Sequence, residues 1–239
     1  MIGLILAGGK GTRLHPYTEE TPKPLIKVNG KAILEHQIEL LLPKVDKIVI
    51  ITGFLREKIE GFVKEKFDTT KITYVHNSEF ENSRPAYAII QALPLLEDAI
   101  IYLNGDVFFD IRILEEVINT SNPNTTAIQK VTWDEEEVNV VLDKDNNIQH
   151  ISKNIPEEKS AGEFIGVTKL GVEFLKKMKE VAEKEGIETF RFSFAIDLIN
   201  HVIQEYQQTL FGLDVTKLKA IEIDTLKDLN TANIMFNEK

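Results

Sequence analysis

A cluster of glycines and a cation follows the first apolar segment of the chain. Residues 2–7, IGLILA, lead directly into Gly8, Gly9 and Gly11, and Arg13 comes shortly after them. Glycines let the backbone approach a ligand closely and leave N–H groups free to bind an anion. Arginine presents a planar pair of donors that matches phosphate oxygens. The pattern therefore predicts a loop that binds phosphate groups.

Two familiar phosphate-binding motifs do not fit this loop. A dinucleotide fingerprint that starts at Gly9 needs another glycine at the position of Leu14. A P-loop that ends at Lys10 needs glycine in place of Leu4, and Ser or Thr in place of Gly11. The glycine loop must therefore be interpreted together with the polar residues that follow it.

A second cation lies further along the same segment. Lys23 stands between Pro22 and Pro24, and the two prolines restrict the backbone around it. Lysine supplies a mobile point charge, where Arg13 supplies a fixed fork of donors. With Thr12 beside Arg13, these residues predict a cradle for a triphosphate with a second anion-binding arm.

Acidic residues follow two of the predicted strands. Asp106 ends the apolar segment 99–106, and ligands of doubly wound sheets collect at the carboxyl ends of strands. We therefore expect Asp106 to face the triphosphate, whose charge Mg²⁺ with oxygen ligands would neutralise. Glu222 and Asp224 share one face of a predicted strand, and Asp224 could instead cap the next helix. Asp110 is expected to cap the helix that follows it.

Strand-like and helix-like patterns alternate through the first half of the chain. Strands are predicted at 2–7, 47–52, 71–77 and 99–106, and helices at 32–42, 56–67 and 85–96. This order is typical of an α/β fold with a mostly parallel, doubly wound sheet. In the second half we expect strands at 126–131, 138–143, 148–151, 163–170 and 218–224, and helices at 171–184, at 193–207 and from 225. The turn-rich segment KDNN predicts a hairpin between two of these strands.

Composition excludes several classes of protein. A net charge of −10 argues against nucleic-acid and anionic-membrane binding, and the absence of cysteine excludes disulfides, thiol catalysis and Cys-based zinc sites. The five histidines lack the spacing of a zinc site. The chain has neither an apolar run long enough for a membrane span nor a signal-peptide pattern, so we expect a cytoplasmic protein.

Residues 6–39, LAGGKGTRLHPYTEETPKPLIKVNGKAILEHQIE, resemble the signature of the nucleotidyltransferases that activate sugar phosphates and small phosphorylated alcohols. The resemblance implies a Rossmann-like three-layer α/β/α nucleotidyltransferase fold, with a mostly parallel central sheet and a β-hairpin-rich C-terminal half. It implies one domain over 1–239. Residues 1–110 would bind the nucleotide, and residues 111–239 would bind the acceptor and complete the metal site. The protein would be a monomer or a homodimer.

The resemblance also implies roles for individual residues. Arg13 would stabilise pyrophosphate as the leaving group, and Lys23 would contact the reacting phosphates. Asp106 would bind Mg²⁺ with one or both of Glu222 and Asp224. The nucleotide would contact Leu6, Ala7, Gly8, Gly9, Gly11, Thr12, Arg13, Lys23, Asn77, Ser83 and Gly105. Lys153 would meet the acceptor's phosphate, and Glu163 an amine or hydroxyl of the acceptor.

The expected reaction is attack by an acceptor phosphate or phosphonate on the α-phosphorus of a nucleoside triphosphate, with release of pyrophosphate. Segments 76–92, 151–154, 162–170 and 222–225 look most like the cytidylyltransferases that act on phosphocholine or 2-aminoethylphosphonate, which favours CTP and a role in cell-surface polysaccharide biosynthesis. The alternative is a sugar-1-phosphate uridylyl-, thymidylyl- or guanylyltransferase. A remote alternative is a non-catalytic sensor of the same fold.

Two further features bear on the acceptor. Arg84 points to a more acidic or more phosphorylated acceptor than choline. A quaternary ammonium group would instead stack on aromatic rings. The candidate rings, which could alternatively pack in the core, are Phe80, Tyr87, Phe164, Phe190, Phe192 and Phe194.

Overall fold

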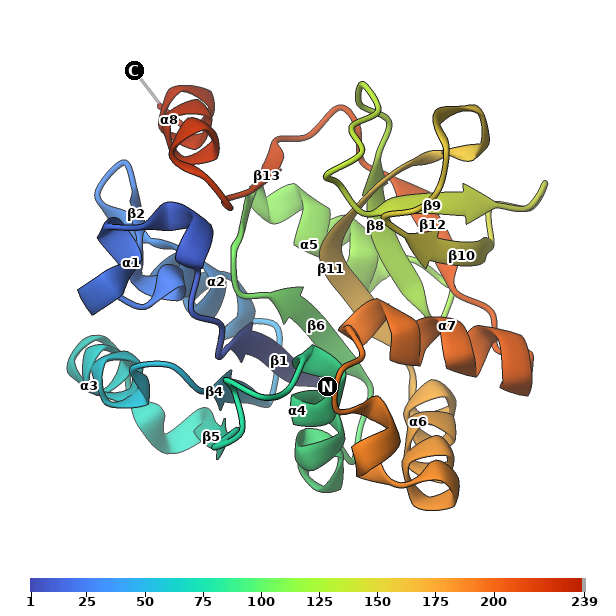
Figure 1. Ribbon diagram of the computed structural model, residues 1–239, viewed down its shortest axis with the longest axis horizontal. Helices are drawn as coiled ribbons and strands as arrows, with labels where there is room; N and C mark the ends of the chain where they lie inside the picture. The colour runs from blue at the N-terminus through green and yellow to red at the C-terminus, as the bar shows by residue number, and fades with distance from the viewer. Residues whose placement is uncertain (238–239) are drawn as a thin grey trace.

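A single mixed sheet forms the centre of the protein in the computed structural model, which describes residues 1–237 (Figure 1). Its parallel part runs in the order β6-β1-β4-β5, with bounds Ile100–Asn104, Ile2–Ala7, Lys47–Thr52 and Ile72–His76. Strand β11 (Gly162–Leu170) pairs with β6 in the antiparallel direction. The predicted mostly parallel sheet is confirmed, and its parallel strands end on the side where the glycine loop begins.

The second half of the chain extends this sheet beyond β11. Strands β9 (Asn139–Leu142) and β10 (Ile148–Ser152) form the predicted antiparallel hairpin, and β8 (Thr125–Gln129) also pairs with β11. Strand β12 (Phe211–Asp214) lies parallel to β8 and was not predicted, because its FGLD sequence contains two weak strand formers.

Helices cover both faces of the sheet and give the three expected layers. One face packs on α2 (Ile33–Leu41), α3 (Arg56–Lys66) and α5 (Ile111–Asn119), and the other on α4 (Pro85–Ala92), α6 (Val172–Glu185) and α7 (Ala195–Tyr206). Alternate residues of β1 enter the two cores: Ile2 and Leu4 join one, and Ile5 and Ala7 join the other. An apolar strand buried on both faces explains the unbroken IGLILA run.

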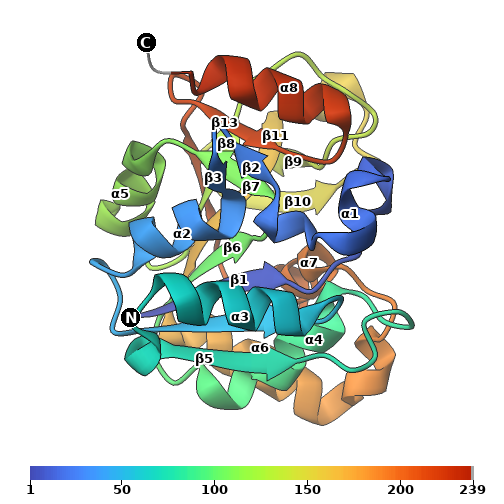
Figure 2. The ribbon, with the colours of Figure 1, turned by 90° about the vertical axis from the view of Figure 1, so that its left-hand side faces the viewer.

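A smaller unit lies beside the sheet. It contains the short helix α1 (Tyr17–Glu20), the hairpin of β2 (Lys27–Val28) and β3 (Lys31–Ala32), the pair β7 (Val107–Phe109) and β13 (Ala220–Glu222), and α8 (Leu226–Met235). Figure 2 shows α8 next to β13 and β2. A third hydrophobic cluster holds this unit together and includes Leu14, Ile26, Phe108 and Ile223. Among residues 1–237, none of the helices combines the length and apolar character needed to cross a bilayer.

Candidate functional site

A cleft of about 710 Å³ opens at the carboxyl ends of β1 and β6. Most of the predicted site residues line it: Leu6, Gly8, Gly9, Gly11, Thr12, Arg13, Lys23, Asn77, Ser83, Gly105, Asp106, Lys153, Glu222 and Asp224. Ala7 and Glu163 are not among the described residues that line the cleft. Sequence reasoning missed Tyr102, Asn104, Val138 and Ile196, which also line it.

Gly11 brings the glycine loop against the lysine arm. Its φ of +62° lies in the left-handed region, and a Cβ at this position would stand 2.9 Å from Cβ of Lys23. The Gly11 carbonyl accepts a hydrogen bond of 2.7 Å from Oγ1 of Thr18, which holds the loop from the outside. Only glycine satisfies both the backbone angle and the close approach to Lys23.

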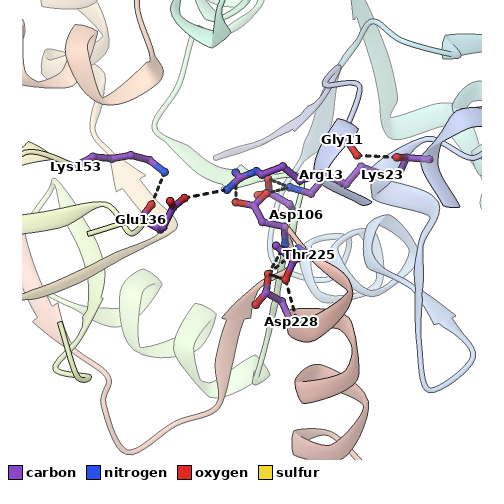
Figure 3. Close-up of polar contacts among 10 residues, drawn as sticks. Gly11, Arg13, Lys23, Asp106, Glu136, Lys153, Thr225 and Asp228 are labelled. Carbon is purple, nitrogen blue, oxygen red and sulfur yellow. Dashed lines mark hydrogen bonds and ion pairs between the residues drawn. The ribbon is translucent and has the colours of Figure 1, made fainter. Parts of the chain in front are cut away.

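The two predicted phosphate-binding cations, Arg13 and Lys23, contact carboxylates in the cleft (Figure 3). Nζ of Lys23 donates to Oδ2 of Asp106 at 2.6 Å and to Oδ1 of Asp224, while Nη2 of Arg13 donates to Oδ2 of Asp224. Lys23 is only 8% exposed. Burial opposes its charge, but Asp106 and Asp224 outweigh burial and raise the pKa of Lys23, so the side chain stays charged. These cations have the chemistry to bind phosphate oxygens.

Three carboxylates form a candidate metal site. Asp106, Glu222 and Asp224 offer oxygens that all lie within 4.8 Å of one another. Oδ1 of Asp106 is buried and has no hydrogen-bond partner within the described residues. Burial, followed by the charges of Asp106 and Asp224, raises the pKa of Glu222 well above its ordinary value. A divalent cation would satisfy the unpaired oxygen and offset the crowded charge, so the donor set fits Mg²⁺.

Asp224 does not cap the last helix. The N-cap of α8 is Thr225, whose backbone N donates to Oδ2 of Asp228 at 2.7 Å, and whose Oγ1 accepts from the Asp228 N–H at 3.3 Å. This capping box satisfies the helix end without Asp224, whose carboxylate faces the cleft instead. Asp110 does cap α5, as predicted, by accepting from the N–H of Arg112 at 2.9 Å.

Asn77 and Ser83 organise the loop that precedes α4. Nδ2 of Asn77 donates to Oγ of Ser83 at 2.9 Å, and Ser83 in turn donates to the carbonyl of Glu79 at 2.8 Å. The structure therefore brings these two predicted nucleotide-binding residues together at one wall of the cleft.

Further cations and exposed rings also line the cleft. Nζ of Lys153 donates to the Glu136 carbonyl at 2.5 Å, and a carboxylate oxygen of Glu136 lies 3.9 Å from Nη1 of Arg13. Figure 3 shows Lys153 approaching from the side opposite Lys23. The Arg84 guanidinium lies 4.8 Å from the ring centre of Phe194.

The aromatic candidates for an acceptor cage divide into two groups. Phe80, Phe164, Phe192 and Phe194 line the cleft, whereas Tyr87 and Phe190 lie outside its described lining. Phe192 is 73% exposed and Phe194 is 46% exposed. The Tyr87 ring is stacked by the Arg191 guanidinium at 4.7 Å, and Phe190 belongs to a hydrophobic core.

Glu163 lies outside the described lining of the cleft. Its neighbour Phe164 lines the cleft, so alternation along β11 turns Glu163 elsewhere. Burial, together with the nearby charges of Glu137 and Asp134, raises the pKa of Glu163 to about 7. The contact between Glu163 and an acceptor stays a prediction.

Comparison with known proteins shows which family the chain resembles. The family model described as nucleotidyl transferase matches residues 2–166. The bifunctional protein GlmU of Methanocaldococcus jannaschii is 34% identical over 205 residues, covering 86% of this chain and 47% of that protein. UTP–glucose-1-phosphate uridylyltransferase AglF of Haloferax volcanii is 30% identical over 139 residues, 56% of each chain. Choline-phosphate cytidylyltransferase of Streptococcus pneumoniae is 39% identical over 94 residues, 39% of this chain and 41% of that protein.

Solved structures share the fold over the whole length. The structure of CTP:phosphocholine cytidylyltransferase (LicC) from Streptococcus pneumoniae superposes with a TM-score of 0.78 at 21% identity, covering 99% of both chains. The chain spans less than half the length of the GlmU proteins that it matches.

Proposed function

Because the chain belongs to the nucleotidyl transferase family, we propose that it transfers a nucleotidyl group from a nucleoside triphosphate to a small phosphorylated acceptor and releases pyrophosphate. The observation that carries this proposal is that Lys23 and Arg13 contact Asp106 and Asp224, two members of a cluster of three carboxylates, beside the glycine loop. The cations suit the phosphates of both substrates, and the carboxylates suit Mg²⁺.

This reaction needs no nucleophile from the protein. An acceptor phosphate oxygen attacks the α-phosphorus, the bond from that phosphorus to the bridging oxygen of the β-phosphate breaks, and its electron pair leaves with pyrophosphate. Lys23 would bind the two reacting anions together, and Arg13 would hold the departing pyrophosphate. Asp106, with Glu222 and Asp224, would hold Mg²⁺, which when bound neutralises charge on the phosphates.

For the substrates, our proposal is CTP with phosphocholine or 2-aminoethylphosphonate. Its support is the similarity to choline-phosphate cytidylyltransferase over 94 residues and the exposed rings of Phe192 and Phe194 at the cleft. Aromatic faces attract quaternary ammonium groups, and such rings are suited to hold the head of a choline.

A second candidate is transfer from UTP to a sugar 1-phosphate. Arg84 already places positive charge on the ring of Phe194, and Lys153 is a second cation in the lining of the cleft. Two cations disfavour an ammonium group and favour hydroxyl or anionic groups on the acceptor. The similarity to AglF, a glucose-1-phosphate uridylyltransferase, supports the same choice.

One experiment separates these substrates. Pyrophosphate release is measured for CTP, UTP, dTTP, GTP and ATP, each mixed with phosphocholine, 2-aminoethylphosphonate and sugar 1-phosphates in the presence of Mg²⁺. Turnover with CTP and either of the first two acceptors supports the first candidate, and turnover with UTP and a sugar 1-phosphate supports the second. Binding of nucleotide without turnover for any pair would contradict the proposed transfer.

A further inference from the structure

The buried side chain of Gln37 contacts the turn that carries Asp106. Gln37 lies in α2 and is fully buried, with 0% of its surface exposed. Its Nε2 donates to the carbonyl oxygens of Asn104 at 2.8 Å and Val107 at 2.9 Å. These two carbonyls mark the end of β6 and the start of β7, so the amide group of Gln37 spans the turn from one side to the other.

The orientation of this amide follows from its neighbours. Both contacted atoms are carbonyl oxygens, which only accept, so the amino group of Gln37 must face them. Within residues 1–237 its Oε1 is buried without a hydrogen-bond partner. An unpaired buried oxygen is unfavourable, and an apolar side chain would fill the same space without it. The two donated hydrogen bonds are therefore what glutamine contributes here.

Other contacts hold the same turn. The Asp106 carbonyl accepts a hydrogen bond of 3.0 Å from the N–H of Ile223, which lies between the other two carboxylates of the cleft. At Gly105 a Cβ would stand 1.8 Å from the Leu6 carbonyl, so no side chain can support the turn from that position. His36, next to Gln37, bonds the Phe109 carbonyl through Nε2 at 2.7 Å. The turn is thus fixed by α2 on one side and by the segment of Ile223 on the other.

We propose that Gln37 is a positioning residue for Asp106 in the metal site. By holding the carbonyls on both sides of Gly105 and Asp106, it fixes the Asp106 carboxylate next to Glu222 and Asp224. Without the two hydrogen bonds the turn can relax, and the three carboxylates no longer converge on one ion. This inference rests on the proposed function, because it takes Asp106 as a metal ligand.

The test uses Gln37→Met, which keeps the length and shape of the side chain but removes both donors. Mn²⁺ binding to the full chain without nucleotide is measured by electron paramagnetic resonance, and turnover is measured separately. We expect Mn²⁺ affinity and kcat to fall about tenfold or more, while KM for the nucleotide changes less than about twofold. A side chain needed only for packing would be replaced by Met with neither effect.

Gln129→Met is the matched control. Gln129 is also buried and donates to a backbone carbonyl, that of Leu218 at 2.7 Å, but this carbonyl does not belong to the turn that carries Asp106. Its substitution should lower the melting temperature without changing Mn²⁺ affinity. Gln37→Glu is the second variant, because it keeps the volume and turns an acceptor toward both carbonyls, and it should lose at least as much affinity as Gln37→Met.

The outcomes distinguish this inference from the proposed function. If the unmodified protein binds Mn²⁺ and turns over, and folded Gln37→Met or Gln37→Glu binds Mn²⁺ within twofold of it, the role of Gln37 is wrong and the proposed function stands. If the unmodified protein binds no Mn²⁺ and shows no turnover with any substrate pair, the proposed function fails and this inference fails with it.

Discussion

The ammonium of Lys23 donates to a carboxylate oxygen of Asp224, although the two residues lie 201 positions apart in the chain. The other oxygen of Asp224 accepts from Arg13. Each cation expected to bind phosphate is therefore tied to a carboxylate expected to bind metal. Substitution of either kind of residue alters the electrostatic surroundings of the other, so single substitutions must be interpreted with the whole cluster in view.

Replacing Lys23 by alanine should abolish most activity. We expect Lys23→Ala to lower turnover about 100- to 1000-fold, because the buried charge that would hold the two reacting anions together is lost. Steady-state pyrophosphate release measures this effect, and circular dichroism checks that the fold is retained. Lys27→Ala is the control, since Lys27 is an exposed cation of the same segment. Near-normal turnover of Lys23→Ala would rule out its assigned role.

Two aspartates at opposite ends of β7 should separate catalysis from stability. Asp106→Ala should reduce turnover at least about 100-fold and weaken Mn²⁺ binding, because one of the three carboxylates is removed. Asp110→Ala removes the N-cap of α5 and should cost about 1 kcal/mol of unfolding free energy with turnover unchanged. For both variants, urea denaturation measures the free energy of unfolding and pyrophosphate release measures turnover. Equal turnover of the two variants would contradict the metal role of Asp106.

The close approach of the glycine loop to Lys23 gives a third prediction. Gly11→Ala introduces a side chain at positive φ and a Cβ that meets Lys23. We expect a loss of about 1 kcal/mol of unfolding free energy and about tenfold or more in turnover. Gly30→Ala carries the same backbone penalty at φ +87° but meets no atom within 4 Å. It should therefore lose stability and keep its turnover. If both glycine variants retain full turnover, the Gly11–Lys23 contact is not needed for catalysis.

Glu163 should make stability depend on pH. Burial and two neighbouring carboxylates raise its pKa to about 7 in the folded chain, above the value of an unfolded glutamate. The folded state thus binds the extra proton, and stability falls as pH rises from about 4.5 to about 7. Above that range the penalty is fully present, so Glu163→Gln should stabilise the protein at pH 8 by up to roughly 2 kcal/mol and little at pH 4.

Urea denaturation of Glu163→Gln at the two pH values measures this difference. The control is Glu183→Gln, because Glu183 is exposed on α6, and it should change stability at neither pH. A Glu163→Gln variant with the same stability as the unmodified protein at pH 8 would show that Glu163 carries no such penalty.

Local chemistry decided which parts of the site the sequence could predict. The glycine loop, Arg13 and Lys23 lie within one short segment after a strand, and Asp106 follows another strand, so doubly wound topology places them at one edge of the sheet. The position of Asp224 in the cleft depended on Thr225 and Asp228 forming a capping box, a choice between neighbouring acids that the pattern left open.

Other features depend on contacts between distant segments. Strand β12 exists because β8 pairs with it, not because of its own residues. Gln37 has the spacing of an ordinary helix residue, and its importance arises from two carbonyls in the turn after β6. Phe164 and not its neighbour Glu163 is in the described lining of the cleft, and the contact of Glu163 with an acceptor stays a prediction.

The hydrophobic cluster that includes Leu14, Ile26, Phe108 and Ile223 joins the segments that carry Arg13, Lys23, Asp106 and Asp224. The segments that carry these four charged side chains thus pack on one hydrophobic cluster, which is separate from the two large cores of the sheet. Mild heating or a cavity-forming change such as Ile223→Ala should therefore abolish the proposed turnover while most of the helical signal persists, so that inactivation precedes global melting.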